Sequence, residues 1–204
     1  MQIGLNGYLK EVQEHQDLLR RGGELSQQQA YFYQSLEIGL NAFKIFIRRF
    51  EKLALEMAKS TKEQARRDEL IIIARNCKQI SQHPPAGFHE ALQLVYFVQL
   101  VLQIESNGHS VSLGRMDQYL NKFYREDMLL GKIDADFALE LFENTWIKLL
   151  SINKIRSWSH TRYSAGGPLY QNVTIGGQTT EGKDAVNDLS FLILQSVGNM
   201  KLTQ

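Results

Sequence analysis

Apolar residues recur at helical spacing along most of the chain and predict a mainly α-helical protein. Over 26–59 they return at intervals of three and four residues, which places them on one face of an α-helix. Ser26, with Gln29 three positions later, has the spacing of a capping box and marks the start of this helix. A looser apolar pattern over 4–19, followed by glycines at 22 and 23, predicts a shorter helix before it.

A third helix should follow directly. Ser60 and Glu63 repeat the capping-box spacing. The helix must end before Pro84, because the residue that precedes a proline is disfavoured in the helical conformation. Together, the helices over 26–59 and 60–82 predict a helical hairpin.

Beyond the prolines, the pattern predicts four more helices and one strand. The helix over 88–104 is nearly all apolar and is expected to be buried. Alternating β-branched residues predict the strand over 172–176. The remaining helices are expected over 116–129, over 134–150 with Asp134 as its cap, and over 185–200.

The charge balance argues against a nucleic-acid partner. The chain has 204 residues, with 23 basic and 22 acidic side chains and a formal net charge of +1. These charges form no stripe of one sign, which a dedicated nucleic-acid surface would require. The apolar helix is interrupted by glutamines and is too short to span a membrane. We therefore expect neither a nucleic-acid nor a membrane partner.

The few cysteines and histidines point to a cytoplasmic protein without a metal site. Cys77 lies in an apolar stretch and is interpreted as a core residue, since free cysteine is among the most buried residue types. One cysteine cannot form an internal disulfide, and no charged-then-apolar leader opens the sequence. His83 and His89 are six positions apart with no accompanying carboxylate cluster, so no metal site is expected.

Polar side chains directly follow the predicted buried helix. The run 105–115 sets His109, Ser110 and Ser112 into an otherwise apolar stretch. Burying a polar group without a partner is costly, so these groups must find hydrogen bonds. Two interpretations stay open: they cap the helix or bond the backbone of the turns at Gly108 and Gly114, or they contact a ligand.

A second polar segment, rich in glycine, spans 165–177. Tyr170 follows Gly166-Gly167-Pro168, a turn that would bring its phenol to the end of the predicted strand. From the residues alone, Tyr170 is interpreted as a half-buried aromatic whose hydroxyl has one partner. Arg115 is expected to be structural and to pair with a carboxylate such as Asp117.

The two polar segments resemble those of the glycyl radical enzymes, the pyruvate formate-lyase and glycerol dehydratase group. The resemblance extends, with gaps, over 83–204. It implies a chain that is mainly α with one or two short strands and that forms part of the family's α/β ten-stranded barrel. The chain would then contain a helical hairpin region, 1–82, and a barrel segment with substrate-pocket motifs, 83–204, both within one larger domain.

In that family, two further loops carry the radical chemistry: one holds the cysteine that becomes a thiyl radical, and the other holds the glycine that stores the radical. Neither loop is present, since Cys77 lies before the matched motifs. We therefore expect an internal piece of a larger enzyme that has no catalytic residue of its own and is inactive alone. The resemblance assigns substrate binding to His109, Ser110, Tyr170 and Ser112.

The His109-Ser110 pair favours a hydroxylated substrate, because dehydratase-like members of the family place such a pair at the substrate's hydroxyl groups. The expected function is a radical dehydratase or lyase that acts on a small hydroxylated molecule. A formate acetyltransferase-type acyl transferase or a decarboxylase is the alternative enzyme. A free-standing helical interaction module without catalysis is the alternative outside the enzymes.

The resemblance also implies a cofactor and partners for the parent enzyme. A glycyl radical would be installed by an activating enzyme that uses S-adenosylmethionine and an iron-sulfur cluster, whereas this segment would bind no cofactor. The parent is expected to be a homodimer in the cytoplasm of an anaerobic organism, because oxygen destroys the radical.

Overall fold

The computed structural model of the chain describes residues 2–23, 25–106, 111–152, 157–164 and 171–201. The chain forms two compact units, Met1–Ala86 and Gly87–Gln204. The domain division that we predict after residue 82 stays a prediction.

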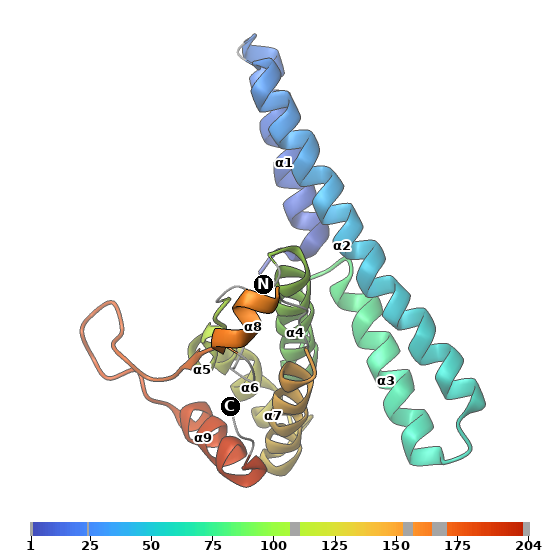
Figure 1. Cartoon of the computed structure of the whole chain (residues 1–204), viewed down its shortest axis with the longest axis vertical. Helices are drawn as coiled ribbons and strands as arrows, with labels where there is room; N and C mark the ends of the chain where they lie inside the picture. Colours follow the sequence, from blue (N-terminus) through green and yellow to red (C-terminus); the bar gives the residue numbers. More distant parts are fainter. Residues whose placement is uncertain (1, 24, 107–110, 153–156, 165–170, 202–204) are drawn as a thin grey trace. The chain divides into compact units, whose positions relative to one another are not determined.

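The first unit consists of three helices, of which the central one is the longest (Figure 1). It packs against the helix on either side of it in sequence. The three are α1 (Gly4–Gly22), α2 (Gln27–Ser60) and α3 (Gln64–Ile80). The predicted helical hairpin, formed by α2 and α3, is confirmed.

The predicted capping box at the start of α2 is also confirmed. The backbone N–H of Gln29 donates to Ser26 Oγ at 3.3 Å, and the backbone N–H of Ser26 donates to Gln29 Oε1 at 2.9 Å. Two of the backbone donors at this helix end therefore have partners.

Small residues bring α2 and α3 close together. Ala54 and Ala58 of α2 are buried against Leu70 and Ala74 of α3. Short side chains let two helix backbones approach, and close packing maximises dispersion contacts. Cys77, one turn after Ala74, is completely buried and forms no disulfide, in agreement with its interpretation as a core residue.

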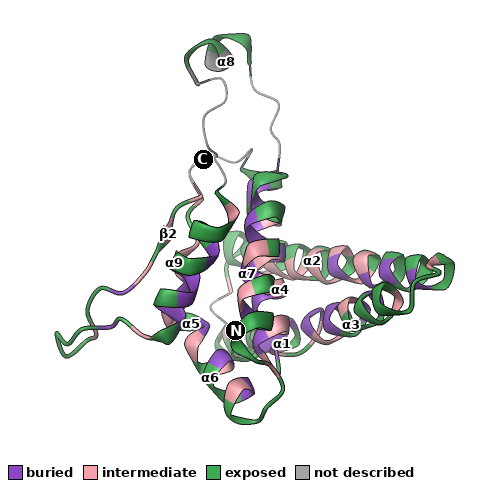
Figure 2. Ribbon diagram, turned by 90° about the horizontal axis from the view of Figure 1, so that it is seen from below, coloured by how far each residue is buried: buried purple, intermediate pink, exposed green. Residues whose placement is uncertain are grey.

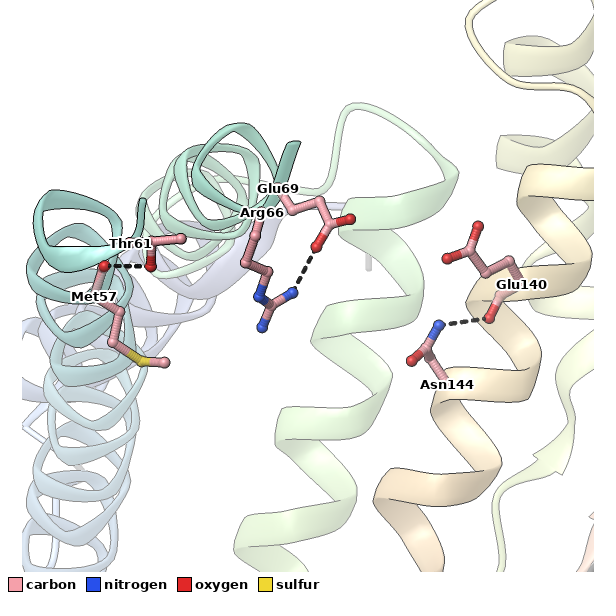
Figure 3. A network of polar contacts seen from close by, with 6 residues as sticks. All are labelled: Met57, Thr61, Arg66, Glu69, Glu140 and Asn144. Atoms are coloured by element: carbon pink, nitrogen blue, oxygen red, sulfur yellow. Dashed lines mark hydrogen bonds and ion pairs between the residues drawn. The ribbon is translucent and has the colours of Figure 1, made fainter. Parts of the chain in front are cut away.

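The capping box predicted for α3 is wrong. Ser60 is the last residue of α2, and its hydroxyl donates to the carbonyl of Met57 at 3.0 Å. Thr61 Oγ1 donates to the same carbonyl at 2.7 Å (Figure 3). Hydroxyl groups readily bond backbone carbonyls three or four residues back, so Ser60 completes one helix instead of starting the next.

The start of α1 depends on a glycine. Gly4 has a φ of +65°, and a Cβ at this position would lie 2.4 Å from the carbonyl carbon of His83. The backbone N–H of Asn6 donates to the carbonyl of Gln82 at 2.9 Å. Only glycine permits both this backbone conformation and the close approach of the 82–84 loop.

The second unit combines helices with one short pair of parallel strands. Its helices are α4 (Phe88–Glu105), α5 (Met116–Tyr119), α6 (Asn121–Leu129), α7 (Ala135–Leu150), α8 (Trp158–Ser164) and α9 (Asp188–Met200). Its strands are β1 (Gly114–Arg115) and β2 (Val173–Thr174), which pair in parallel. In the part of the chain that the structure describes, no helix has both the length and the apolar character needed to cross a bilayer.

Three elements predicted in the second unit differ from the structure. The helix expected over 116–129 is divided into α5 and α6 at Leu120, whose side chain is completely buried. The strand expected over 172–176 is two residues long. The last helix begins at Asp188, because the side chain of Asn187 caps it by accepting from the backbone N–H groups of Leu189 and Ser190.

The cap predicted for α7 is confirmed. Asp134 Oδ1 accepts the backbone N–H of Phe137 at 2.8 Å. Within the helix, the side chain of Asn144 donates to the carbonyl of Glu140 at 3.0 Å (Figure 3). Buried residues recur along α7 (Figure 2) and form its core-facing side: Ala138, Phe142, Thr145, Trp146 and Leu149.

An aromatic cluster forms the centre of this core. Phe88 and Phe142 are completely buried, and their rings contact edge to face at 5.7 Å. Phe142 also stacks on Trp146 at 5.7 Å, and Tyr124 lies edge-on to Phe88 at 5.6 Å. The cluster joins α4, α6 and α7 through the ring geometries that aromatic pairs prefer.

Candidate functional site

The parallel strands bring the two polar segments of the sequence together. Gly114 pairs with Val173 and Arg115 with Thr174, and the backbone N–H of Leu113 donates to the carbonyl of Asn172 at 3.0 Å. In a parallel pair the residues before the two strands lie at the same end. The strand β1 lies at the end of the polar run 105–115, and β2 lies within the glycine-rich segment 165–177. The described residues that precede the two strands, 111–113 and 171–172, therefore lie side by side.

Three of the four predicted substrate contacts, His109, Ser110 and Tyr170, lie outside the described residues. The fourth, Ser112, has an exposed side chain and directly precedes Leu113, the first residue of the strand ladder. The assignment of these four residues to substrate binding stays a prediction.

A buried glutamine, which the sequence analysis did not select, links the two segments. Gln99 of α4 has a side chain that is only 3% exposed. Its Nε2 donates to the carbonyl of Val111 at 2.8 Å and to Oε1 of Gln171 at 3.0 Å. The Nε2 of Gln171 in turn donates to the carbonyl of Leu149 at 3.2 Å. The signal in the sequence was an amide in the middle of a nearly all-apolar helix.

Tyr119 makes a second contact with the polar run. Its hydroxyl donates to the carbonyl of Leu113 at 3.1 Å. Partial burial of the ring raises the pKa of the Tyr119 hydroxyl, because a phenolate would lose hydration there. The group therefore stays protonated at neutral pH and acts as a hydrogen-bond donor.

A buried carboxylate organises the other end of the strand pair. Asp117 is completely buried, and its Oδ2 accepts the backbone N–H of Gly176 at 2.6 Å and the hydroxyl of Ser190 at 2.5 Å. The side chain of Asn187 donates to the carbonyl of Asp117 at 3.1 Å. Gly176 has a φ of +63°, which favours glycine. Asp117 thus connects α5 to the segment after β2 and to α9.

We expected Arg115 to pair with a carboxylate such as Asp117, but Asp117 does not form this ion pair. Arg115 donates from its guanidinium to the carbonyl of Gln178 at 3.0 Å. The acceptor oxygen Oδ2 of Asp117 is occupied by Gly176 and Ser190. The backbone N–H of Gly176 and the hydroxyl of Ser190 thus bond Asp117 where the arginine was expected. Arg115 instead bonds the backbone after β2.

Replacing Asp117 with leucine should lower the free energy of unfolding by about 2–3 kcal/mol, because the N–H of Gly176 and the hydroxyl of Ser190 lose their buried acceptor. Chemical denaturation of the chain measures the effect. The matched control is Asp136→Leu, an exposed position in the first turn of α7, which should cost less than about 1 kcal/mol. Equal losses in the two variants would contradict the structural role of Asp117.

The burial of His89, in the first turn of α4, should make the stability of the chain depend on pH. Burial lowers the pKa of His89 from 6.5, because the low-dielectric surroundings disfavour the imidazolium. The folded chain then binds a proton less readily than the unfolded chain. The stabilising contribution is fully present above about pH 6.5 and is lost as the pH falls through the lower, folded value.

Chemical denaturation between about pH 7.5 and pH 5.5 tests this expectation. The stability of the chain should decrease toward acid, and His89→Gln, which cannot be protonated there, should flatten the decrease. An identical pH dependence in the parent chain and in His89→Gln would rule out this role for the histidine.

The described ranges contain no group of three or more His, Cys, Asp or Glu side chains that could hold a metal ion. The amide, hydroxyl and carbonyl groups described around the parallel strands bond one another and so hold the strand pair in place.

The chain is similar throughout its length to known enzymes. The model of the family described as "Pyruvate formate lyase-like" matches residues 1–204. A protein of Escherichia coli K12 named "Probable dehydratase YbiW" is 49% identical over 208 residues, which cover 100% of this chain and 26% of that protein.

Two solved structures share the fold. A structure titled "1,2-propanediol Dehydration in Roseburia inulinivorans; Structural Basis for Substrate and Enantiomer Selectivity" has a TM-score of 0.93 at 38% identity, covering 100% of this chain and 24% of that one. The glycerol-bound form of the B12-independent glycerol dehydratase from Clostridium butyricum has a TM-score of 0.90 at 37% identity, covering 100% of this chain and 25% of that one.

These matches confirm the predicted fold class. The described residues are mainly helical with short strands, and they superimpose on one segment of the family's barrel. The chain spans about a quarter of the length of the proteins it matches. It belongs to the pyruvate formate lyase-like family of glycyl radical enzymes.

Proposed function

We propose that this chain supplies one wall of the substrate pocket of a glycyl radical dehydratase or lyase that acts on a small hydroxylated molecule. The observation that carries the proposal is the parallel register of Gly114 with Val173. This register places Leu113 beside Asn172, three residues after Ser110 and two residues after Tyr170 in the chain. Similarity to a glycerol dehydratase and to a protein studied in propanediol dehydration supports the substrate class.

The proposed chemistry explains why an imidazole and hydroxyl groups belong in this pocket. Residues outside this chain would supply the radical, whose chemistry would be removal of a hydrogen atom from a carbon that bears a hydroxyl group. This loss makes the hydroxyl far more acidic. His109 would accept its proton while the leaving group departs from the neighbouring carbon, and Ser110 and Tyr170 would orient the substrate through hydrogen bonds. A pocket closed to water strengthens these bonds and shields the radical.

The cofactor and partners of the parent follow from the same proposal. A glycine elsewhere in the polypeptide would store the radical, and an activating enzyme with S-adenosylmethionine and an iron-sulfur cluster would install it. The parent would act as a cytoplasmic homodimer. The two parts of this chain, 1–82 and 83–204, would both belong to one larger domain of the parent.

The test is to express the full-length polypeptide that contains this segment, under anaerobic conditions and together with its activating enzyme. Electron paramagnetic resonance should detect a glycine-centred radical. The activated protein is then given a panel of diols, glycerol, amino alcohols and hydroxyproline, with pyruvate and coenzyme A as a separate reaction.

Formation of the radical and elimination of water or another leaving group from a hydroxylated compound would support the proposal. Turnover of pyruvate with coenzyme A alone would instead establish the acyl transferase. Failure to form any radical, with the activating enzyme shown to be competent on another substrate protein, would contradict the proposed function.

A further inference from the structure

We propose that Gln99 is a positioning residue whose side-chain amide sets the spacing between the two segments that bear the substrate contacts. The inference rests on the proposed function and deepens it. The juxtaposition that carries it is one buried nitrogen, Nε2 of Gln99, bonded to Val111 and to Gln171 at once.

The chemistry of the amide explains why a glutamine lies at this place in α4. A primary amide has two N–H donors on one nitrogen, and both are used, one for each segment. In proteins, burying an amide without hydrogen-bond partners costs about 1–3 kcal/mol. Because Gln99 is only 3% exposed, its two bonds offset a cost that a leucine in the same helix would not have.

The positions of the two acceptors point to the substrate pocket. Val111 directly follows Ser110 in the chain, and Gln171 directly follows Tyr170. The amide therefore holds the first described residue after each predicted contact. Since both acceptor oxygens lie against one nitrogen atom, they must lie close to each other as well.

The second glutamine extends the link to a rigid element. Nε2 of Gln171 donates to the carbonyl of Leu149 in the last turn of α7. The same carbonyl, near the end of α7, also accepts the backbone N–H of Ile152 at 3.2 Å. The chain of contacts thus runs from α4 through Gln99 and Gln171 to α7, and Gln171 is bonded to both of these packed helices.

The strand pair alone is too short to hold the two segments together firmly. The ladder between β1 and β2 comprises two residues in each strand, with one further bond from Leu113 to Asn172. A ladder of this length is marginal without other support. Gln99 and Gln171 provide that support on the side of the ladder where the candidate contacts begin.

The experiment uses the activated full-length enzyme and the best substrate of the panel. Methionine resembles glutamine in length and volume but cannot donate a hydrogen bond, so Gln99→Met and Gln171→Met remove the bonds with little change in packing. Misplacing a reacting group by about 1 Å can cost about 100-fold in rate. We expect each variant to lower kcat/KM by about 10- to 100-fold, with a glycyl radical yield equal to that of the parent.

A double-mutant cycle separates positioning from general damage. If the two glutamines act as one link, Gln99→Met/Gln171→Met should be no worse than the more impaired single variant. The matched control is Gln118→Met, which removes a bond of 2.8 Å from an amide to the carbonyl of Ala185 at the other end of the strands. It should lower the unfolding temperature to a similar extent but leave KM and kcat unchanged.

Additive losses in the cycle, a wild-type kcat/KM in Gln99→Met, or an equal loss in Gln118→Met would overturn the inference. Amide hydrogen exchange keeps it separate from the proposed function, since it needs no substrate. The backbone N–H of Leu113 should exchange faster in Gln99→Met than in the parent. Unchanged exchange there would refute the positioning role, whereas a parent enzyme with no turnover on the panel would refute only the function.

Discussion

Replacing His109 with alanine in the activated full-length enzyme should reduce kcat/KM by about 10²- to 10⁴-fold. This is the usual contribution of a positioned general base, and it corresponds to about 3–5 kcal/mol of transition-state stabilisation. The physical reason is that alanine cannot accept the proton that the substrate's hydroxyl releases once its carbon has lost a hydrogen atom. Steady-state kinetics on the best compound of the panel measure the loss.

Two controls make the result interpretable. His15 is an exposed histidine on α1, and His15→Ala should keep the parent's kcat/KM. The radical yield of His109→Ala, measured by electron paramagnetic resonance, should equal that of the parent, because the imidazole acts after the radical has formed. Unchanged turnover in His109→Ala would contradict the role of general base and favour the structural alternative that the sequence left open.

Replacing Phe142 with alanine should lower the free energy of unfolding by about 3–5 kcal/mol, the usual cost of truncating a buried aromatic ring. Phe142 is completely buried and contacts both Phe88 and Trp146. Its removal would leave a cavity at the junction of α4 and α7. Chemical denaturation of the chain, followed by tryptophan fluorescence, measures the change, since the ring of Trp146 stacks on the side chain that is removed.

The same substitution at Phe137 provides the comparison. Phe137 lies in the same helix but is 38% exposed, so Phe137→Ala should cost about 1 kcal/mol. If the two variants lost the same stability, the aromatic cluster would not be the centre of the core.

The sequence predicted those parts of the fold that depend on neighbouring residues. The capping box of Ser26 and the cap of Asp134 were predicted correctly, because the groups that bond each other are three residues apart. The apolar periodicity located α2 and α7 for the same reason. The helix predicted over 88–104 agrees with α4 to within one residue.

Predictions from local patterns were wrong where two different local structures use the same residue types. Ser60 has the spacing of a helix cap, but a serine hydroxyl can equally bond a carbonyl of the preceding turn, as it does at Met57. The division between α5 and α6 at Leu120 left no trace in the apolar pattern, since this leucine is buried on either reading. Strand β1 was not predicted, because two residues show no periodicity.

The candidate site shows the same division between local and distant information. The sequence by itself determined the family, the mainly helical fold class and the two polar segments, since all three are read from residues close together in the chain. Only the tertiary structure decided that the described ends of these segments are neighbours, through the register of Gly114 with Val173. It also assigned Arg115 to the carbonyl of Gln178, and Gln99 to both Val111 and Gln171. Partners 12 to 72 positions apart in the chain meet only when the helices pack, because a hydrogen bond depends on position in space and leaves no periodic mark in the sequence.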